Sequence, residues 1–469
     1  MKKDTIKAIW ITSFLVGVTF LTLSYATMRG EVPDNPADTG VVHLKGALTE
    51  EKILMNGDGR FGFSLEMTAE DVMEDVETQP SNVDMVIVLD QSGSMSGSKI
   101  DDARQAILKL LAVLSSRDRF GLVGYADQAK VYSEIVHVTP GNRSQLESIV
   151  RAIRPEGGTN LGAGLSLGMR MHDLARPMGN NARIVLVSDG LANQGIVDPE
   201  SLTAMANQSA QNGCPVSAVG VGNDFNEMLM TGIADRGMGG YYFLETPDAF
   251  FHVFSKELSF SKTVAASSIE VRIPLQEGLV LESAGGYPIS VQEGCAVFYP
   301  GEIRSGTSRK LYLKFRAPVH REGAFSISDI QVAYRSNDEP GVASLKDRFQ
   351  VTCTSDREKA YASINKEEWE QQVLQDDYNT LKEEVAMDVK AGKKSDALKK
   401  ITAYRDKQET LNAVVGSARV AENLTEDLGK IEAAVNDTFE GTHHDVARKQ
   451  KTMSKVLQFE AYQGKRDKK

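Results

Sequence analysis

The stretch that decides the fold is Val86-Ile-Val-Leu-Asp90-Gln-Ser92-Gly-Ser94-Met-Ser-Gly97. Its first half is an apolar run typical of a buried strand, and that strand places an acidic residue, Asp90, at its end. Two hydroxyl side chains follow two and four positions later, on Ser92 and Ser94. Because alternate residues of a tight loop can point toward one place, these three side chains form a candidate site for a cation that prefers oxygen ligands.

Two later segments offer oxygen ligands of the same kind. The first is the glycine-rich loop Glu156-Gly-Gly-Thr159-Asn160, in which Thr159 adds a hydroxyl. The second is Ile184-Val-Leu-Val-Ser-Asp189-Gly190, an apolar run that again ends in an acidic residue. Taken alone, each fragment is also typical of an ordinary strand exit, helix cap or turn. Their common placement at strand ends favours one shared site.

Residues 82–259 alternate short apolar runs with amphipathic ones, which predicts an α/β, doubly wound, Rossmann-like fold with a mostly parallel sheet. The second and third strands are close enough in sequence to form a hairpin, which adds one antiparallel edge. The predicted strands are Met85–Leu89, Phe120–Tyr125, Val131–Val138, Arg183–Ser188, Pro215–Val221 and Tyr241–Leu244, and the predicted helices are Ile100–Leu114, Ser144–Ile153, Gly162–Leu174, Pro199–Gln211, Glu227–Ala234 and Asp248–Leu258.

The expected strand order explains why the candidate ligands meet. In a doubly wound sheet of order 3-2-1-4-5-6, the first and fourth strands are neighbours, and ligands bind beyond their carboxyl ends. Asp90 and Asp189 would flank that crevice, with Ser92, Ser94 and Thr159 around it. Two carboxylates and three hydroxyls, with no His or Cys close in sequence, suit Mg²⁺; Mn²⁺ and Ca²⁺ are alternatives, and zinc is a poor match.

The segments on either side of this unit are rich in strand patterns or in helix patterns. Residues 41–78 contain two or three strands, too few for a core of their own, and residues 263–354 alternate like an antiparallel β-sandwich. We expect the strands of 41–78 to complete that sandwich, so that the α/β unit is inserted in a β domain. Residues 357–469 contain no proline and have apolar residues at helical spacing, which predicts two to four helices.

The chain opens with the layout of an export signal. Three lysines within the first seven residues precede an apolar run over residues 8–23, and small residues follow that fit cleavage after Ala26. Counted from Ile6 to Ala26, the segment has about 21 residues and is also just long enough to remain as a membrane anchor. Residues 1–26 are therefore predicted to be a signal peptide or signal anchor, and residues 27–40 a linker. Both alternatives place the rest of the chain outside the cytoplasm, in the periplasm or the extracellular space.

Composition excludes several classes of protein. The 469 residues carry a formal net charge of −11, which argues against a nucleic-acid partner. An aromatic content of 7% and a mean hydropathy of −0.27 exclude a multi-span membrane protein. The three cysteines lack the paired spacing of a zinc site or a disulfide framework. Cys214 is expected to be a small core residue. Cys295 and Cys353 are a candidate disulfide, since both fall in the same β-rich region.

The motifs together resemble those of a known family. Asp90-x-Ser92-x-Ser94, Gly157-Gly158-Thr159-Asn160 and Val187-Ser188-Asp189-Gly190 resemble the metal-ion-dependent adhesion site of a von Willebrand factor type A (VWA) domain. The flanking layout resembles that of bacterial proteins related to the inter-alpha-trypsin inhibitor heavy chains. The resemblance implies that Mg²⁺ is bound at this site and that an acidic side chain of a protein partner fills its last coordination position. The implied metal ligands are Asp90, Ser92, Ser94, Thr159 and Asp189.

Three functions remain open at this point. The favoured one is an exported, non-enzymatic binding protein that docks an acidic residue of a partner through Mg²⁺. The second is an envelope scaffold in which the metal only stabilises the fold. The third, a metal-dependent hydrolase, is disfavoured because no general base or nucleophile is placed near the ion. Gly164-Leu-Ser166-Leu-Gly168 fits the nucleophile-elbow pattern, but it lies inside a predicted helix.

Overall fold

A computed structural model of the chain describes residues 40–71, 81–175, 179–245, 249–337 and 339–466. The expected signal or anchor, the linker up to residue 39 and part of the acidic segment before residue 81 lie outside these residues. Within the described ranges, no helix is both long enough and apolar enough to cross a membrane.

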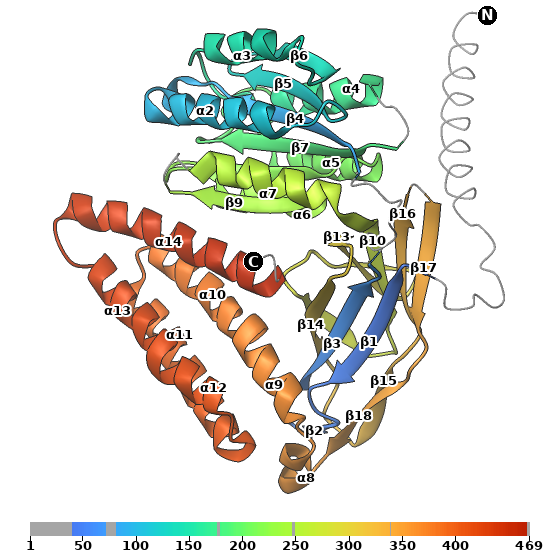
Figure 1. The fold of residues 1–469 in the computed structure, drawn as a ribbon. Helices are drawn as coiled ribbons and strands as arrows, with labels where there is room; N and C mark the ends of the chain where they lie inside the picture. The colour runs from blue at the N-terminus through green and yellow to red at the C-terminus, as the bar shows by residue number, and fades with distance from the viewer. Residues whose placement is uncertain (1–39, 72–80, 176–178, 246–248, 338, 467–469) are drawn as a thin grey trace, which may run out of the picture. The chain divides into compact units, whose positions relative to one another are not determined.

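The first layer of the fold is a six-stranded sheet in the order β6-β5-β4-β7-β8-β9 (Figure 1). All neighbours are parallel except β5 and β6, which form the expected antiparallel edge. Numbered within this unit, the order is 3-2-1-4-5-6, as predicted. The strands are β4 (Val83–Asp90), β5 (Arg119–Tyr125), β6 (Ala129–His137), β7 (Asn181–Ser188), β8 (Val216–Val221) and β9 (Met238–Leu244).

Helices cover both faces of this sheet, which is why β4 is apolar throughout its middle. Met85, Ile87 and Leu89 pack with α2, α3 and α7, whereas Val86 and Val88 pack with α4, α5 and α6. The helices are α2 (Ser98–Val113), α3 (Arg143–Ala152), α4 (Leu161–Ala175), α5 (Pro199–Gln211), α6 (Glu227–Arg236) and α7 (Phe250–Lys262). Together, these elements form the α/β fold that the sequence predicts.

The nucleophile-elbow pattern lies inside α4, as expected, and its glycines serve packing. A Cβ on Gly164 would lie 2.5 Å from the Tyr125 ring, and one on Gly168 would lie 2.7 Å from a Val88 methyl carbon. Ser166 is exposed on the helix surface. The small residues therefore let α4 approach the sheet closely, and no strand-to-helix elbow is present at this serine.

The flanking β strands come from both sides of the α/β unit. They form a sheet of order β1-β3-β14-β11, a second of order β12-β13-β10-β16-β17, and a third of order β15-β18-β2. The strands are β1 (Val42–Leu48), β2 (Lys52–Leu54), β3 (Arg60–Ala69), β10 (Val264–Pro274), β11 (Val280–Ala284), β12 (Ser290–Gln292), β13 (Cys295–Arg304), β14 (Ser308–Arg316), β15 (Gly323–Ile327), β16 (Ile330–Ser336), β17 (Glu339–Leu345) and β18 (Phe349–Thr354).

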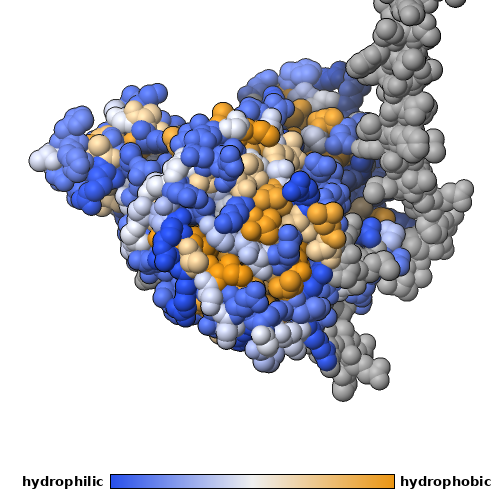
Figure 2. Space-filling view, turned by 90° about the horizontal axis from the view of Figure 1, so that it is seen from above, coloured by the Kyte–Doolittle hydropathy of each residue, from blue (hydrophilic) through white to orange (hydrophobic). Residues whose placement is uncertain are grey.

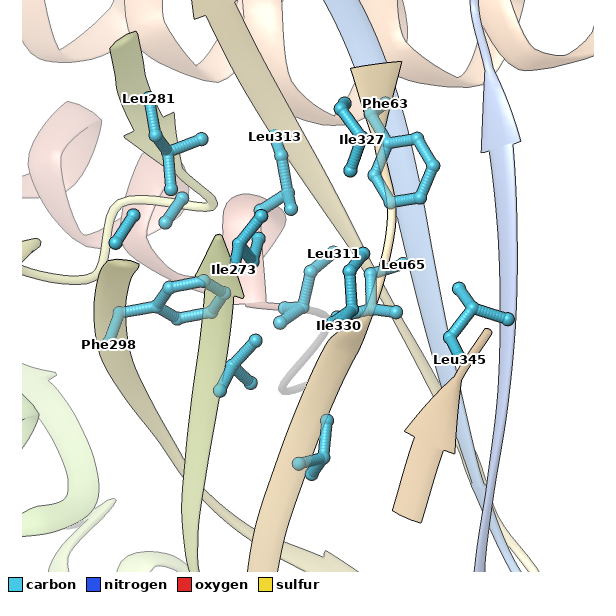
Figure 3. Packing of buried hydrophobic residues seen from close by; sticks show 14 of the residues in the cluster. Phe63, Leu65, Ile273, Leu281, Phe298, Leu311, Leu313, Ile327, Ile330 and Leu345 are labelled. Carbon is cyan, nitrogen blue, oxygen red and sulfur yellow. The ribbon is translucent and has the colours of Figure 1, made fainter. Parts of the chain in front are cut away.

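Strand β3 connects the part of the β domain that precedes the α/β unit in sequence to the part that follows it, because it pairs with both β1 and β14. It pairs antiparallel with β14 from Arg60 opposite Arg316 to Thr68 opposite Ser308. In the core, Phe63 and Leu65 of β3 lie among side chains of the later strands, such as Leu311 (Figure 3). The early strands thus complete the later sandwich, as expected. One detail differs from the prediction of a purely antiparallel domain, because β2 pairs parallel with β18.

A fragment of residues 263–354 alone is expected to aggregate. It would expose the edges of β14 and β18 that β3 and β2 cover in the whole chain, and uncovered strand edges recruit other chains. Co-expression of residues 41–78 should restore the soluble fraction, measured by centrifugation and size-exclusion chromatography. A soluble fragment that unfolds cooperatively on its own would contradict this arrangement of the β domain.

The cysteines behave as isolated thiols. Cys214 is buried, as expected, and burial raises the pKa of its thiol to about 12. The candidate disulfide is wrong for this structure: Cys295 and Cys353 are both free thiols. Cys295 lies on β13, whereas Cys353 lies on β18, and these strands belong to different sheets.

The C-terminal region is helical, and its longest continuous stretches span residues 366–390, 394–415, 418–438 and 443–466. The capping signals are local: Asn365 and Ser417 accept bonds from the backbone at the starts of α9 and α12. The elements are α8 (Arg357–Ala362), α9 (Lys366–Gln372), α10 (Tyr378–Lys390), α11 (Lys394–Val415), α12 (Ala418–Glu422), α13 (Leu428–Thr438) and α14 (His443–Arg466), with π-helical turns at Val373–Asp377 and Asn423–Asp427.

Helix α14 also contacts the α/β unit, which the sequence did not indicate. Buried Lys455 donates to the Phe225 carbonyl at 2.8 Å and pairs with the Glu227 carboxylate at 2.8 Å. The Tyr462 hydroxyl accepts a bond from the Tyr241 amide at 3.1 Å, and the two rings pack edge to face. The helical region is thus attached to the α/β unit through a buried polar and aromatic contact.

Candidate metal site

Asp90 is fixed at the carboxyl end of β4, where the strand leaves the sheet. Its side chain is fully buried and accepts two hydrogen bonds, from the Ser92 amide at 2.8 Å and from the Ser188 hydroxyl at 3.0 Å. Ser188 belongs to the neighbouring strand β7. These bonds hold the carboxylate in one orientation between the two strand ends.

The two serines of the first motif connect Asp90 to Asp189. After Asp90 the chain forms a short 3₁₀ turn, η1 (Gly93–Met95), which turns the hydroxyls of Ser92 and Ser94 toward each other at 2.9 Å. Ser94 then donates to a carboxylate oxygen of Asp189 at 2.7 Å. Four of the five predicted ligands are therefore linked by short hydrogen bonds.

Thr159 reaches the same place from a separate loop. It is buried, and Asn193 orients it by accepting a bond from its amide at 2.9 Å. A Cβ built on Gly190 would lie 3.7 Å from the Ser94 hydroxyl oxygen and 3.8 Å from that of Thr159, so both oxygens border one small space. The structure thus brings all five predicted side chains to the carboxyl edge of β4 and β7.

A further acidic residue, Asp127, organises the Thr159 loop. Its carboxylate accepts bonds from the Gly158 amide at 2.7 Å and from the Gln194 side chain at 2.6 Å. Gly157 has a φ of 64°, and a Cβ there would lie 2.5 Å from the Asp127 carboxylate, so the glycine is required. Sequence reasoning missed Asp127, although its position just after a predicted strand was a usable signal.

Lys99 is the second residue of the site that sequence reasoning missed. It lies at the start of α2, and its ammonium nitrogen is 2.5 Å from the Asp189 carboxylate oxygen that Ser94 does not contact. About a quarter of the Lys99 side chain is exposed. The Lys99 ammonium therefore neutralises the charge of Asp189. The Asp90 carboxylate accepts its hydrogen bonds only from uncharged groups, the Ser92 amide and the Ser188 hydroxyl.

The donor set fits a hard divalent cation. Burial, reinforced by the nearby charge of Asp189, raises the pKa of Asp90 to about 6. A cation beside this carboxylate would therefore offset the free-energy cost of keeping it ionised in a buried position. Over the described ranges, no three His, Cys, Asp or Glu side chains gather as a metal cluster. The site relies instead on hydroxyl and carboxylate oxygens, which suit Mg²⁺ better than zinc.

Large apolar side chains are exposed beside this site. Leu191, Ile196 and Val197 lie in the loop that follows Asp189 and are roughly half exposed. These three side chains give the loop that directly follows the candidate ligand Asp189 exposed apolar area. Elsewhere the surface is mixed: the face shown in Figure 2 has apolar residues gathered near its middle and polar residues around them.

A doubly wound sheet of this order, with this hydroxyl and carboxylate set at its carboxyl edge, is the arrangement of a VWA domain. Residues 84–255 match the family model of the von Willebrand factor type A domain. This chain therefore contains a VWA domain, inserted in a β domain and followed by a helical region.

Particular relatives match over different lengths. "Uncharacterized protein YfbK" of Escherichia coli is 30% identical over 200 residues, which cover 42% of this chain and 34% of that protein. Inter-alpha-trypsin inhibitor heavy chain H3 of Mus musculus is 25% identical over 368 residues, covering 74% of this chain and 39% of that protein. The chain thus spans little more than a third of the length of these relatives.

A solved structure shares the fold over most of the chain. It is described as von Willebrand factor type A from Catenulispora acidiphila, and it matches with a TM-score of 0.65 at 16% identity. The match covers 91% of this chain and 98% of that one. The shared fold therefore extends beyond the VWA domain into the flanking regions.

Proposed function

We propose that this protein is an exported, non-enzymatic binding module that docks an acidic residue of a protein partner through Mg²⁺. The observation that carries the proposal is the convergence of five oxygen-bearing side chains from three loops on one edge of the sheet. VWA domains are commonly protein-interaction modules, which supports the same function. The proposed ligands are Asp90, Ser92, Ser94, Thr159 and Asp189.

The chemistry of docking follows from the donor set. When bound, Mg²⁺ would supply an electrophilic centre whose remaining position takes a partner carboxylate. Neutral hydroxyls from Ser92, Ser94 and Thr159 would leave much of the ion's charge available for that carboxylate. The exposed side chains of Leu191, Ile196 and Val197 would add apolar contact around the polar centre.

Export is part of this proposal. The N-terminal layout, a basic start followed by an apolar run and small residues, supports a signal peptide or anchor. The partner would then lie in the periplasm, at the cell envelope or outside the cell.

A capture experiment separates docking from stabilisation. The immobilised full chain is incubated with envelope extract in Mg²⁺ or EDTA, next to Asp90→Ala and Thr159→Ala variants. We expect EDTA and Asp90→Ala to abolish capture. Thr159→Ala should weaken capture by about 1–3 kcal/mol while changing Mg²⁺ binding less, because the other ligands persist. Capture that survives EDTA and both substitutions would contradict the proposal and favour the scaffold function.

Replacing Lys99 with methionine is expected to increase Mg²⁺ affinity about tenfold. The Lys99 ammonium contacts Asp189 at 2.5 Å, so it competes with an incoming cation for the same carboxylate, and a tenfold change equals about 1.4 kcal/mol. Calorimetric titration measures the effect. Lys109→Met is the matched control, because it removes one positive charge from the same helix. Unchanged or weaker Mg²⁺ binding in Lys99→Met alone would refute this role for Lys99.

A further inference from the structure

A cavity of about 390 Å³ lies at the opposite edge of the VWA sheet from the candidate metal site. It is bordered by the amino end of β9 and by α7 on the VWA side, and by β13 and β14 on the side of the β domain. Its volume falls in the range of small-molecule sites. The charged side chains that line it are Arg183, Lys256, Glu257, Glu302, Arg304 and Arg309.

The two carboxylates of the cavity are already engaged. Buried Arg183 forms ion pairs with both Glu257 and Glu302. Glu257 also accepts a bond from the Tyr242 hydroxyl at 2.5 Å. These groups form an internal network whose ion pairs do not include Arg304 or Arg309.

Arg304 and Arg309 are the two arginines of the lining that lie outside this network. Arg309 is 8% exposed and donates to the Pro300 carbonyl at 2.7 Å, and Arg304 lies 5.5 Å from the centre of the Phe260 ring. Over the part of the chain that the structure describes, neither guanidinium has a carboxylate within ion-pair distance. A guanidinium has five donors in a planar fork, so both side chains retain donors for a ligand.

Electrostatics make this cavity favourable for negative charge. Burial lowers the pKa of Lys256; the charge of Glu257 opposes this shift, whereas the nearby charge of Arg304 adds to it. Four cations and two carboxylates line the cavity, so its lining carries a net charge of +2 if His252 is neutral. An anion placed among these cations would relieve their mutual repulsion.

We propose that this cavity binds the oxyanion group of a small organic phosphate or carboxylate, held by Arg304 and Arg309. The fork of each guanidinium matches the paired oxygens of both groups. Such a ligand would contact α7 of the VWA domain and strands of the β domain at once. The proposal does not depend on the metal site, which lies at the other edge of the sheet.

The test is a titration of the full chain with inorganic phosphate and, separately, with succinate. Both are compared with KCl at equal ionic strength, by thermal unfolding and by calorimetry. We expect one anion to bind once per chain and to raise the melting temperature, and which anion does so identifies the preferred oxyanion. Arg304→Gln should weaken that binding at least tenfold. Arg321→Gln, an equal charge loss at an exposed loop position, should not.

Two outcomes would overturn the proposal. The first is an unfolding temperature and heat signal that neither anion changes relative to KCl. The second is an anion response that persists unchanged in Arg304→Gln, since that response would come from general surface charge. Because Arg304 is exposed, its substitution should leave the fold intact, and the wild-type titration decides the first outcome by itself.

Discussion

Replacing Arg183 with methionine is expected to destabilise the folded chain by about 3–5 kcal/mol. The substitution would leave Glu257 and Glu302 buried without their shared cation, and an unpaired buried charge carries a cost of this size. Arg183 lies on β7 of the VWA domain, whereas Glu302 lies on β13 of the β domain. Urea unfolding of the full chain, followed by circular dichroism, measures the loss.

A double-mutant cycle provides the control for this prediction. Glu302→Gln in the Arg183→Met background removes one of the stranded charges, so the double variant should be more stable than Arg183→Met alone. A loss below about 1 kcal/mol for Arg183→Met would mean that the ion pairs contribute as little as exposed ones do. In that case the network between the two domains would not be a major source of stability.

Mg²⁺ is expected to raise the melting temperature of the full chain, and Asp90→Ala should remove most of this response. An ion that binds only the folded state stabilises it by mass action, by about 2.7 kcal/mol at one hundred times its dissociation constant. Differential scanning calorimetry without MgCl₂ and at several MgCl₂ concentrations measures the shift. Asp90→Asn, which keeps the shape of the side chain, should lose the response as well.

Asp101→Ala is the matched control for this experiment. Asp101 is exposed in the first turn of α2 and pairs with Arg104, so its loss removes one carboxylate outside the proposed ligand set. This variant should keep the wild-type response to Mg²⁺. An equal response in Asp90→Ala and the wild type would show that the ligands are assigned wrongly.

Much of the VWA fold follows from local sequence patterns. The apolar runs that end in Asp90 and Asp189 are continuous because both faces of a parallel sheet are buried, so they could be recognised without a structure. Parallel neighbours bring their carboxyl ends to one edge, and this places the two carboxylates together. The unpartnered strands of 41–78 likewise predicted pairing with the later β region, which β3 and β14 provide.

Other features depend on contacts between distant segments and leave no local pattern. Lys455 has the sequence context of a solvated helix charge, yet it is buried against Glu227, 228 positions earlier in the chain. Lys99 has the sequence context of an ordinary residue at the start of a helix, and its role depends on the fold, which places Asp189 beside it. Whether Cys295 and Cys353 form a disulfide could not be decided from the sequence either, because it depends on which strands share a sheet. In the structure the two cysteines lie in different sheets and are free thiols.

The most direct test of the central claim is a calorimetric titration of Mg²⁺ into the metal-free full chain and its Asp90→Ala variant. We expect one ion per wild-type chain and at least a hundredfold weaker binding in the variant, because even the loss of an outer partner of a metal ligand weakens affinity about 10–100-fold. Equal binding by both proteins, or no binding by the wild type at millimolar Mg²⁺, would contradict the claim that Asp90 holds a metal ion.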